Sequence, residues 1–279
     1  MPMHWERITV FCFFASYAMA LLLEVAQFLY RSRTIRLAAV GFTVAGLVAH
    51  TGYLVARSQQ AELPPLLAST HDWFLVLAWL TVALQLGLQV WNLEFSLGLF
   101  VLPLALALVS ASQFVRNSPN PRLGTLRHWS MAHASLWVLG IGGVALALVT
   151  ALMYLVQHNR LRHKQAEVRG LHLFSLERLN RMNWWLIVTS VPLLTLGMAS
   201  GLWMTYLARD SAHPVNLASL DFIANALMWL MMAMLCGWLL TTRRPAGKIV
   251  AWRTVLACSF LLAVLVIMKI LSTDGIHSG

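Results

Sequence analysis

The stretch Arg127–Gln157, RHWSMAHASLWVLGIGGVALALVTALMYLVQ, decides the fold class of this chain. It opens with His128 and His133 and then carries no Asp, Glu, Lys or Arg as far as Gln157. A run of about 20 apolar residues is long enough for a helix to cross the hydrocarbon core of a bilayer. The stretch therefore predicts a membrane-spanning helix with histidines at its mouth, where a neutral imidazole can offer a nitrogen lone pair to a metal.

The composition of the whole chain indicates an integral membrane protein. Hydrophobic residues make up 59% of the 279 residues, charged residues 11%, and the mean hydropathy is +0.71. Soluble domains carry about one quarter charged residues. We therefore expect one transmembrane domain over residues 1–279. The formal net charge of +10 lies mostly in short segments between apolar runs, which favours a role in membrane orientation and argues against nucleic-acid binding.

Eight apolar runs are long enough to cross a bilayer as helices, which predicts an all-α, polytopic fold. The third and fourth runs are separated only by Trp91–Glu94, which predicts a tight helical hairpin. Gly197-x-x-x-Gly201 in the sixth run either lets two helices approach closely or occurs there by chance. The runs are Ile8–Leu29, Leu37–Ala56, Trp73–Val90, Phe95–Val115, Ser130–Val156, Trp184–Leu207, Leu220–Leu240 and Ile249–Leu271.

The distribution of basic residues predicts the orientation, because cytoplasmic loops are enriched in Lys and Arg. Twelve basic residues flank one side of the eight runs and six the other. Both termini are then expected on the outer face, together with His71, His128, His133, His213 and His277. The twelve are Arg31, Arg33, Arg36, Arg160, Arg162, Lys164, Arg169, Arg178, Arg181, Arg243, Arg244 and Lys248; the six are Arg7, Arg57, Arg116, Arg122, Arg127 and Arg209.

Histidines are the main candidates for chemistry. No Walker loop, HExxH motif or GxSxG elbow occurs in the chain, so we do not expect an enzyme. His50 lies inside the second run, where it is either functional or a neutral residue hydrogen-bonded to a neighbouring helix. From the residues alone, His277 in the closing GIHSG is either a ligand or a solvated residue of the tail.

Four stretches, taken in order, resemble the cytochrome c assembly family, the CcsA/ResC-type haem-handling membrane proteins with their HemX and YpjD-like relatives. They are GLVAHTGYLVARSQQAELPPLLASTHDWFLVLAWL, WSMAHASLWVLGIGGVALALVTALMYL, LERLNRMNWWLIVTSVPLLTLGMASGLWM and RRPAGKIVAWRTVLACSFLLAVLVIMKILSTDGIHSG. The family's tryptophan-rich outer loop is missing here, although Trp203 and Asp221 remain. The chain is therefore most similar to the HemX/YpjD-like branch.

The resemblance implies particular roles for three histidines. His133 and His277 match the outer-face axial ligands of haem iron in the family, and His50 matches the histidine within the membrane. The implied cofactor is haem b, and the implied location is the inner, cytoplasmic membrane as a multi-pass protein. The implied partners are membrane lipid and either a ResB/CcsB-type membrane protein or apocytochrome c.

The function expected on this basis is the handling or export of haem b for c-type cytochrome assembly. Two other functions stay open at this point. One is a HemX-like membrane regulator of haem biosynthesis that acts through a partner. The other is a small-solute or ion transporter, which is the weaker reading because no carboxylate is evident facing a path through the membrane.

The charge bias makes the topology testable. Reporter fusions at Arg169 and Gly279 should report opposite compartments, with Gly279 on the outer side, because twelve basic residues lie on the other side. Compartment-specific enzyme activity of each fusion is the measurement. If both fusions report the same compartment, the number of spans is wrong, first of all in the hairpin around Trp91–Glu94.

Overall fold

The regular structure of the chain is helical throughout the residues that the structure describes. The structure is a computed structural model, and it describes residues 9–27, 30, 32–61, 64, 69–91, 97–115, 127–162, 174–207, 220–242 and 247–274. The helices are α1 (Val10–Ala26), α2 (Arg33–Ala61), α4 (Thr70–Trp91), α5 (Gly98–Ser112), α6 (Arg127–Arg162), α7 (Leu176–Leu207), α8 (Leu220–Thr241) and α9 (Gly247–Asp274).

Each expected apolar run coincides with one of these helices, so the all-α, multi-pass architecture is confirmed. Six of the helices are long and apolar enough to cross a membrane. The other two, α1 and α5, have 17 and 15 residues. The count of eight spans and the sides of the termini therefore stay predictions.

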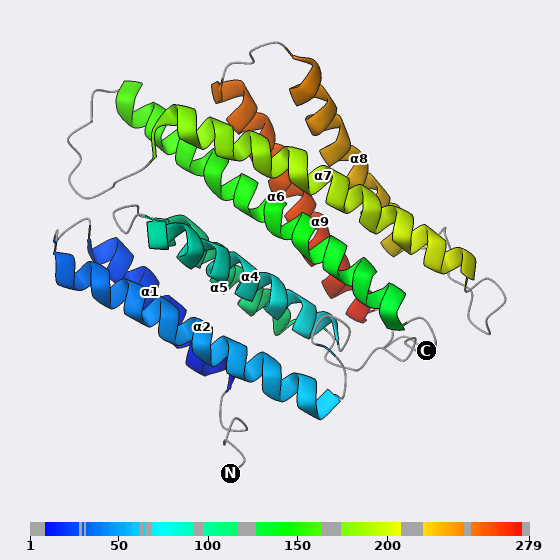
Figure 1. Ribbon diagram of the computed structural model, residues 1–279, viewed down its shortest axis with the longest axis horizontal. Helices are drawn as coiled ribbons and strands as arrows, with labels where there is room; N and C mark the ends of the chain where they lie inside the picture. The colour runs from blue at the N-terminus through cyan, green and yellow to red at the C-terminus, as the bar shows by residue number, and fades with distance from the viewer. Residues whose placement is uncertain are drawn as a thin grey trace.

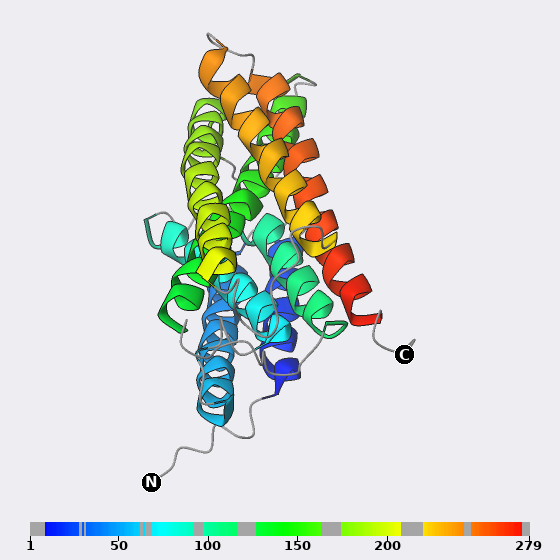
Figure 2. The ribbon, with the colours of Figure 1, turned by 90° about the vertical axis from the view of Figure 1, so that its right-hand side faces the viewer.

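The helices form two groups that meet at α6. One group contains α1, α2, α4 and α5, and the other contains α6, α7, α8 and α9. The blue to teal helices lie side by side in Figure 1, and the green to red helices lie beyond them. The main contacts between the groups run from α4 and α5 to α6. Figure 2 shows the same bundle turned by 90°, with the helices roughly along one common direction.

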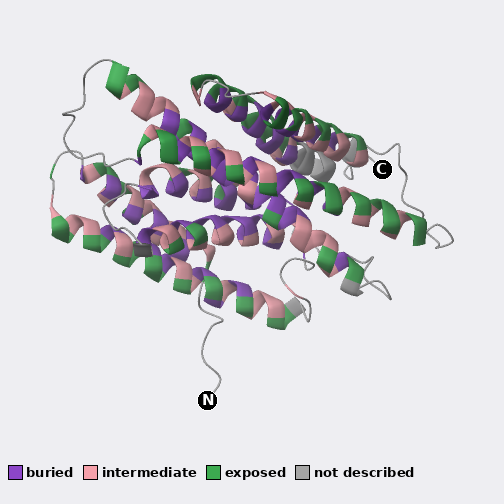
Figure 3. Cartoon of the chain, turned by 45° about the horizontal axis from the view of Figure 1, so that its top comes forward, coloured by how far each residue is buried: buried purple, intermediate pink, exposed green. Residues whose placement is uncertain are grey.

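Large apolar side chains cover the outside of the bundle. Phe11 is 73% exposed, Leu256 66% and Leu196 56%. Figure 3 shows this pattern as green outer faces and purple inner faces on most helices. A lipid-facing surface has this composition, because hydrocarbon does not penalise exposed apolar groups.

Glycines on α6 and α7 let these two helices interlock. On α7, Gly197 lies against the Trp137 ring and Gly201 against the His133 ring, so a Cβ at either glycine would lie 3.0 Å from the ring. On α6, Gly140 lies against Leu194, and Gly143 against the Ser190 side chain. The Gly197-x-x-x-Gly201 pair is therefore a packing motif and not a chance occurrence. Small residues at this spacing let helices approach closely in membranes.

The helices around the long loop extend further than the apolar runs predict. We expected the loop between the fifth and sixth runs to cover Gln157–Asn183, but α6 continues to Arg162 and α7 begins at Leu176. The hydroxyl oxygen of Ser175 accepts the backbone N–H of Arg178 at 3.3 Å, which is a helix N-cap. Hydropathy shows where the apolar part of a helix ends, whereas the capping residue shows where the helix itself ends. The predicted and observed boundaries therefore differ.

The interlocked glycines generate a stability prediction. Gly140→Ala should lower the melting temperature in detergent, because the new methyl group would lie 2.7 Å from Leu194 Cδ2 and 3.3 Å from the Leu194 backbone nitrogen. Such overpacking costs about 1–3 kcal/mol. The matched control is Gly41→Ala on α2, where nothing lies within 4 Å, and where alanine should be neutral or slightly stabilising. Equal melting temperatures for the two variants would contradict the interlock.

Candidate functional site

His133 is held against α7 by its Nδ1 atom. This atom lies 3.0 Å from the backbone oxygen of Gly197 and 3.0 Å from Ser200 Oγ. The Ser200 hydroxyl itself donates to Gly197 O at 2.8 Å. Since a carbonyl oxygen only accepts, the Nδ1 atom of His133 must carry the hydrogen. A neutral His133 then keeps its lone pair on Nε2, which is the arrangement of histidines that bind a metal through Nε2.

The local sequence explains why His133 takes this position. Trp137 lies one turn further along α6, and its ring and the His133 ring pack edge to face with centroids 6.4 Å apart. Both rings fit over the glycines of α7, because Gly197 and Gly201 are likewise one turn apart. The imidazole is half-buried, so it is neither enclosed in the core nor free in solvent.

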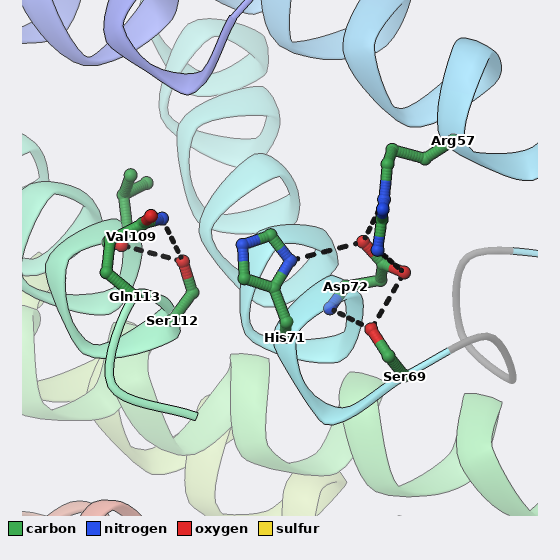
Figure 4. A network of polar contacts seen from close by, with 7 residues as sticks. All are labelled: Arg57, Ser69, His71, Asp72, Val109, Ser112 and Gln113. Carbon is green, nitrogen blue, oxygen red and sulfur yellow. Dashed lines mark hydrogen bonds and ion pairs between the residues drawn. The ribbon is translucent and has the colours of Figure 1, made fainter. Parts of the chain in front are cut away.

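A second histidine, His71, belongs to a buried polar network at the start of α4 (Figure 4). Its Nδ1–H donates to Asp72 Oδ1 at 3.3 Å. Arg57 of α2 donates from Nε and Nη2 to the two oxygens of Asp72, both at 3.1 Å. Asp72 is fully buried. Such a fork-shaped pair fixes both partners, because each oxygen receives its own N–H.

Ser69 completes this network as the N-cap of α4. The Ser69 hydroxyl oxygen accepts the backbone N–H of Asp72 at 3.1 Å, and the hydroxyl donates to Asp72 Oδ2 at 2.8 Å. Sequence reasoning placed His71 on the outer face but missed Asp72 and Arg57. The signal was present, because Ser69-x-x-Asp72 before an apolar run has the spacing of a capping box.

His71 and His133 lie at the same end of the bundle. Leu77 and Leu80 of α4 lie against Gly142 of α6, and the two helices run in the same direction (Figure 1). The beginning of α4, which carries His71, is therefore at the same end as the beginning of α6, which carries His133. The C-terminal end of α9, drawn in red in Figures 1 and 2, is at this end too.

His50 lies apart from His133, in the packing between α2 and α1. It is fully buried, its ring stacks on Phe13 with centroids 4.1 Å apart, and its Nδ1 lies 3.2 Å from the Tyr17 hydroxyl. His50 therefore has the hydrogen bond to a neighbouring helix that was the second of its two expectations. Its Nε2 atom has no hydrogen-bond partner among the described residues.

The remaining histidines of the expected outer face are not located by the structure. His277 and His213 lie outside the described residues, and the side chain of His128 is likewise not described. The predicted pairing of His133 with His277 consequently stays a prediction. Within the described ranges, no group of three or more His, Cys, Asp or Glu residues is placed to hold a metal ion.

Comparison with protein-family models, with curated proteins and with solved structures finds no match to this chain. The resemblance to cytochrome c assembly proteins therefore depends on the four sequence stretches alone.

The Arg57–Asp72 pair generates a prediction about stability. Asp72→Asn should lower the free energy of unfolding by about 3 kcal/mol, because it leaves the Arg57 charge without its carboxylate in a largely buried site. Chemical unfolding in detergent, followed by circular dichroism, measures the change. The double variant Arg57→Met, Asp72→Asn should cost less than the sum of the two single variants, because each single variant already breaks the Arg57–Asp72 pair. Strict additivity would contradict the pairing.

Proposed function

We propose that this chain is a haem-binding integral membrane protein that handles or exports haem b for c-type cytochrome assembly. The observation that supports this best is the bonding of His133. Its Nδ1–H donates to the Gly197 carbonyl, so that Nε2 is the nitrogen available to iron. Haem b would supply an iron that neutral imidazoles can bind.

The protein side of such a site has three parts. The Gly197 carbonyl and Ser200 fix the orientation of His133. The packing of α6 on α7 fixes the position of His133 along the helix axis, because Gly201 lies directly against its ring. The apolar outer surface of the bundle lies beside His133. Such a surface is a more favourable environment for an apolar porphyrin ring than water is.

The second axial ligand in this proposal is His277, by resemblance to the family. Asp274 ends α9 at the same end of the bundle as His133, and His277 follows three positions later. His71 is the alternative second ligand, because Asp72 engages its Nδ1 in the same way as Gly197 engages that of His133. His50 is the proposed internal haem-binding position. Its Nε2, which has no hydrogen-bond partner among the described residues, is the atom that would contact the iron there.

The visible spectrum of the purified protein tests the proposal. Wild-type protein in mild detergent, supplied with haem b, should show the sharp reduced α-band of bis-histidine haem. His133→Ala should abolish this band or convert it to that of a five-coordinate haem, and added imidazole should partly restore it. His158→Ala is the matched control, because His158 lies on the same helix about 38 Å further along its axis. The control should leave the band unchanged.

The same spectrum distinguishes the two second ligands. If His277 is the second ligand, His277→Ala gives the same change as His133→Ala, and the double variant is little worse than either single one, because the pair acts as a unit. If His71→Ala gives the change instead, His71 is the ligand. A wild-type protein that binds no haem would contradict the proposal and favour a regulator that acts through a partner.

A further inference from the structure

A cavity of about 660 Å³ lies between the two helix groups, away from the three candidate histidines. Its walls come from α4 and α5 on one side and from α6 and α7 on the other. The walls are mainly apolar, and they include Leu97, Val101 and Val149. Leu84 and Trp185, which also line the cavity, are 40% and 56% exposed. The cavity therefore opens sideways through the outer surface that faces lipid.

Charged side chains lie at one end of this cavity. Glu177, Arg178 and Arg181 are in the first two turns of α7 and belong to the lining. Arg181 Nη2 lies 2.6 Å from Glu177 Oε1, and the Arg178 guanidinium lies 4.4 Å from the centre of the Phe174 ring. Among the described residues of the lining, two arginines accompany one glutamate, so this part of the lining has a net positive charge.

The charged end lies one bilayer thickness away from His133. Arg178 and Gly201, which packs on His133, are about 35 Å apart along the axis of α7. The hydrocarbon core of a bilayer is about 30 Å thick. If the His133 end is at one membrane surface, the arginines are therefore at the headgroup level of the other, which the distribution of basic residues predicts to be the inner surface.

Gln85 supplies a polar group inside the cavity. Its side chain lines the cavity, is 1% exposed, and its Oε1 has no hydrogen-bond partner among the described residues. A lipid ester group only accepts hydrogen bonds, so its partner in this cavity would be the NH2 group of Gln85, which donates.

We propose that this cavity binds one anionic phospholipid from the inner leaflet. The phosphate lies between Arg178 and Arg181, an acyl chain fills the apolar part next to Val149, and the NH2 group of Gln85 donates to an ester carbonyl of the lipid. Charge complementarity selects the anionic headgroup, because basic pockets between transmembrane helices hold such headgroups. The lipid then fills the space between the two helix groups and contacts both of them.

Native mass spectrometry with phosphatidylglycerol and phosphatidylcholine of identical acyl chains tests this site. Wild-type protein should retain phosphatidylglycerol more strongly than phosphatidylcholine. The variant Arg178→Gln, Arg181→Gln should bind phosphatidylglycerol about 30-fold more weakly, because each arginine near the surface contributes about fivefold. The control Arg33→Gln, Lys248→Gln removes two exposed charges at the same end of the bundle, outside the cavity lining, and should bind like wild type.

Gln85→Leu provides a second test that does not alter the charge. It should bind phosphatidylglycerol about fivefold more weakly, since one hydrogen bond is lost. Its melting temperature without lipid should not fall, because the unpaired amide is removed as well. The site is disproved if both lipids bind equally, or if the Arg178→Gln, Arg181→Gln variant and its control lose equal affinity. Both outcomes are independent of haem binding.

Discussion

The close approach of α6 and α7 is the constraint on which the other parts of the bundle depend. Each helix places large side chains over glycines of its partner, as Trp137 over Gly197 and Leu194 over Gly140 show. The same approach brings the Gly197 carbonyl within reach of His133. Since α4, α5 and α9 all pack on α6, its position relative to α7 also sets the place of the first helix group. A change at one glycine therefore alters both the packing and the orientation of the candidate ligand.

Single polar bonds join neighbouring helices within the apolar bundle. The Trp79 indole N–H donates to Thr51 of α2, the Trp229 N–H donates to Thr195 of α7, and the Asn183 amide donates to Thr254 of α9, at 2.8, 2.9 and 3.0 Å. Bonds of this kind contribute about 0.6 kcal/mol each on average in membrane proteins. Their main effect is to select one helix arrangement, because each bond forms only when the two helices have the correct rotation and the correct shift along their axes. Packing supplies the bulk of the stability, and these bonds select one arrangement.

The sequence predicted the positions of the helices well, because a helix that crosses a membrane must contain a long apolar run. It predicted the helix ends less well, since α6 and α7 continue beyond the apolar residues into turns that carry Arg162 and Glu177. The spacing of Ser69 and Asp72 carried a signal, but the pairing of Asp72 with Arg57 was out of reach for a different reason. Arg57 and Asp72 are in different helices, and hydropathy carries no information about which polar residues meet. The Nδ1 bond of His133 was likewise invisible, because its partner is a backbone carbonyl whose position depends on packing.

The order of the helices along the chain bears on how the bundle assembles during synthesis. The most extensive contacts join α6 with α7, α1 with α2, and α4 with α5, and each of these pairs is consecutive in the sequence. Contacts between sequence neighbours form quickly, because little chain has to be closed into a loop. The chain can thus emerge and pair as successive hairpins, starting at the N-terminal side. The packing of α1 on α5 completes the first group before α6 is made, whereas α9 is the last helix to reach α6. Ribosome-bound chains that stop after α5 should therefore already contain a closed unit of α1, α2, α4 and α5.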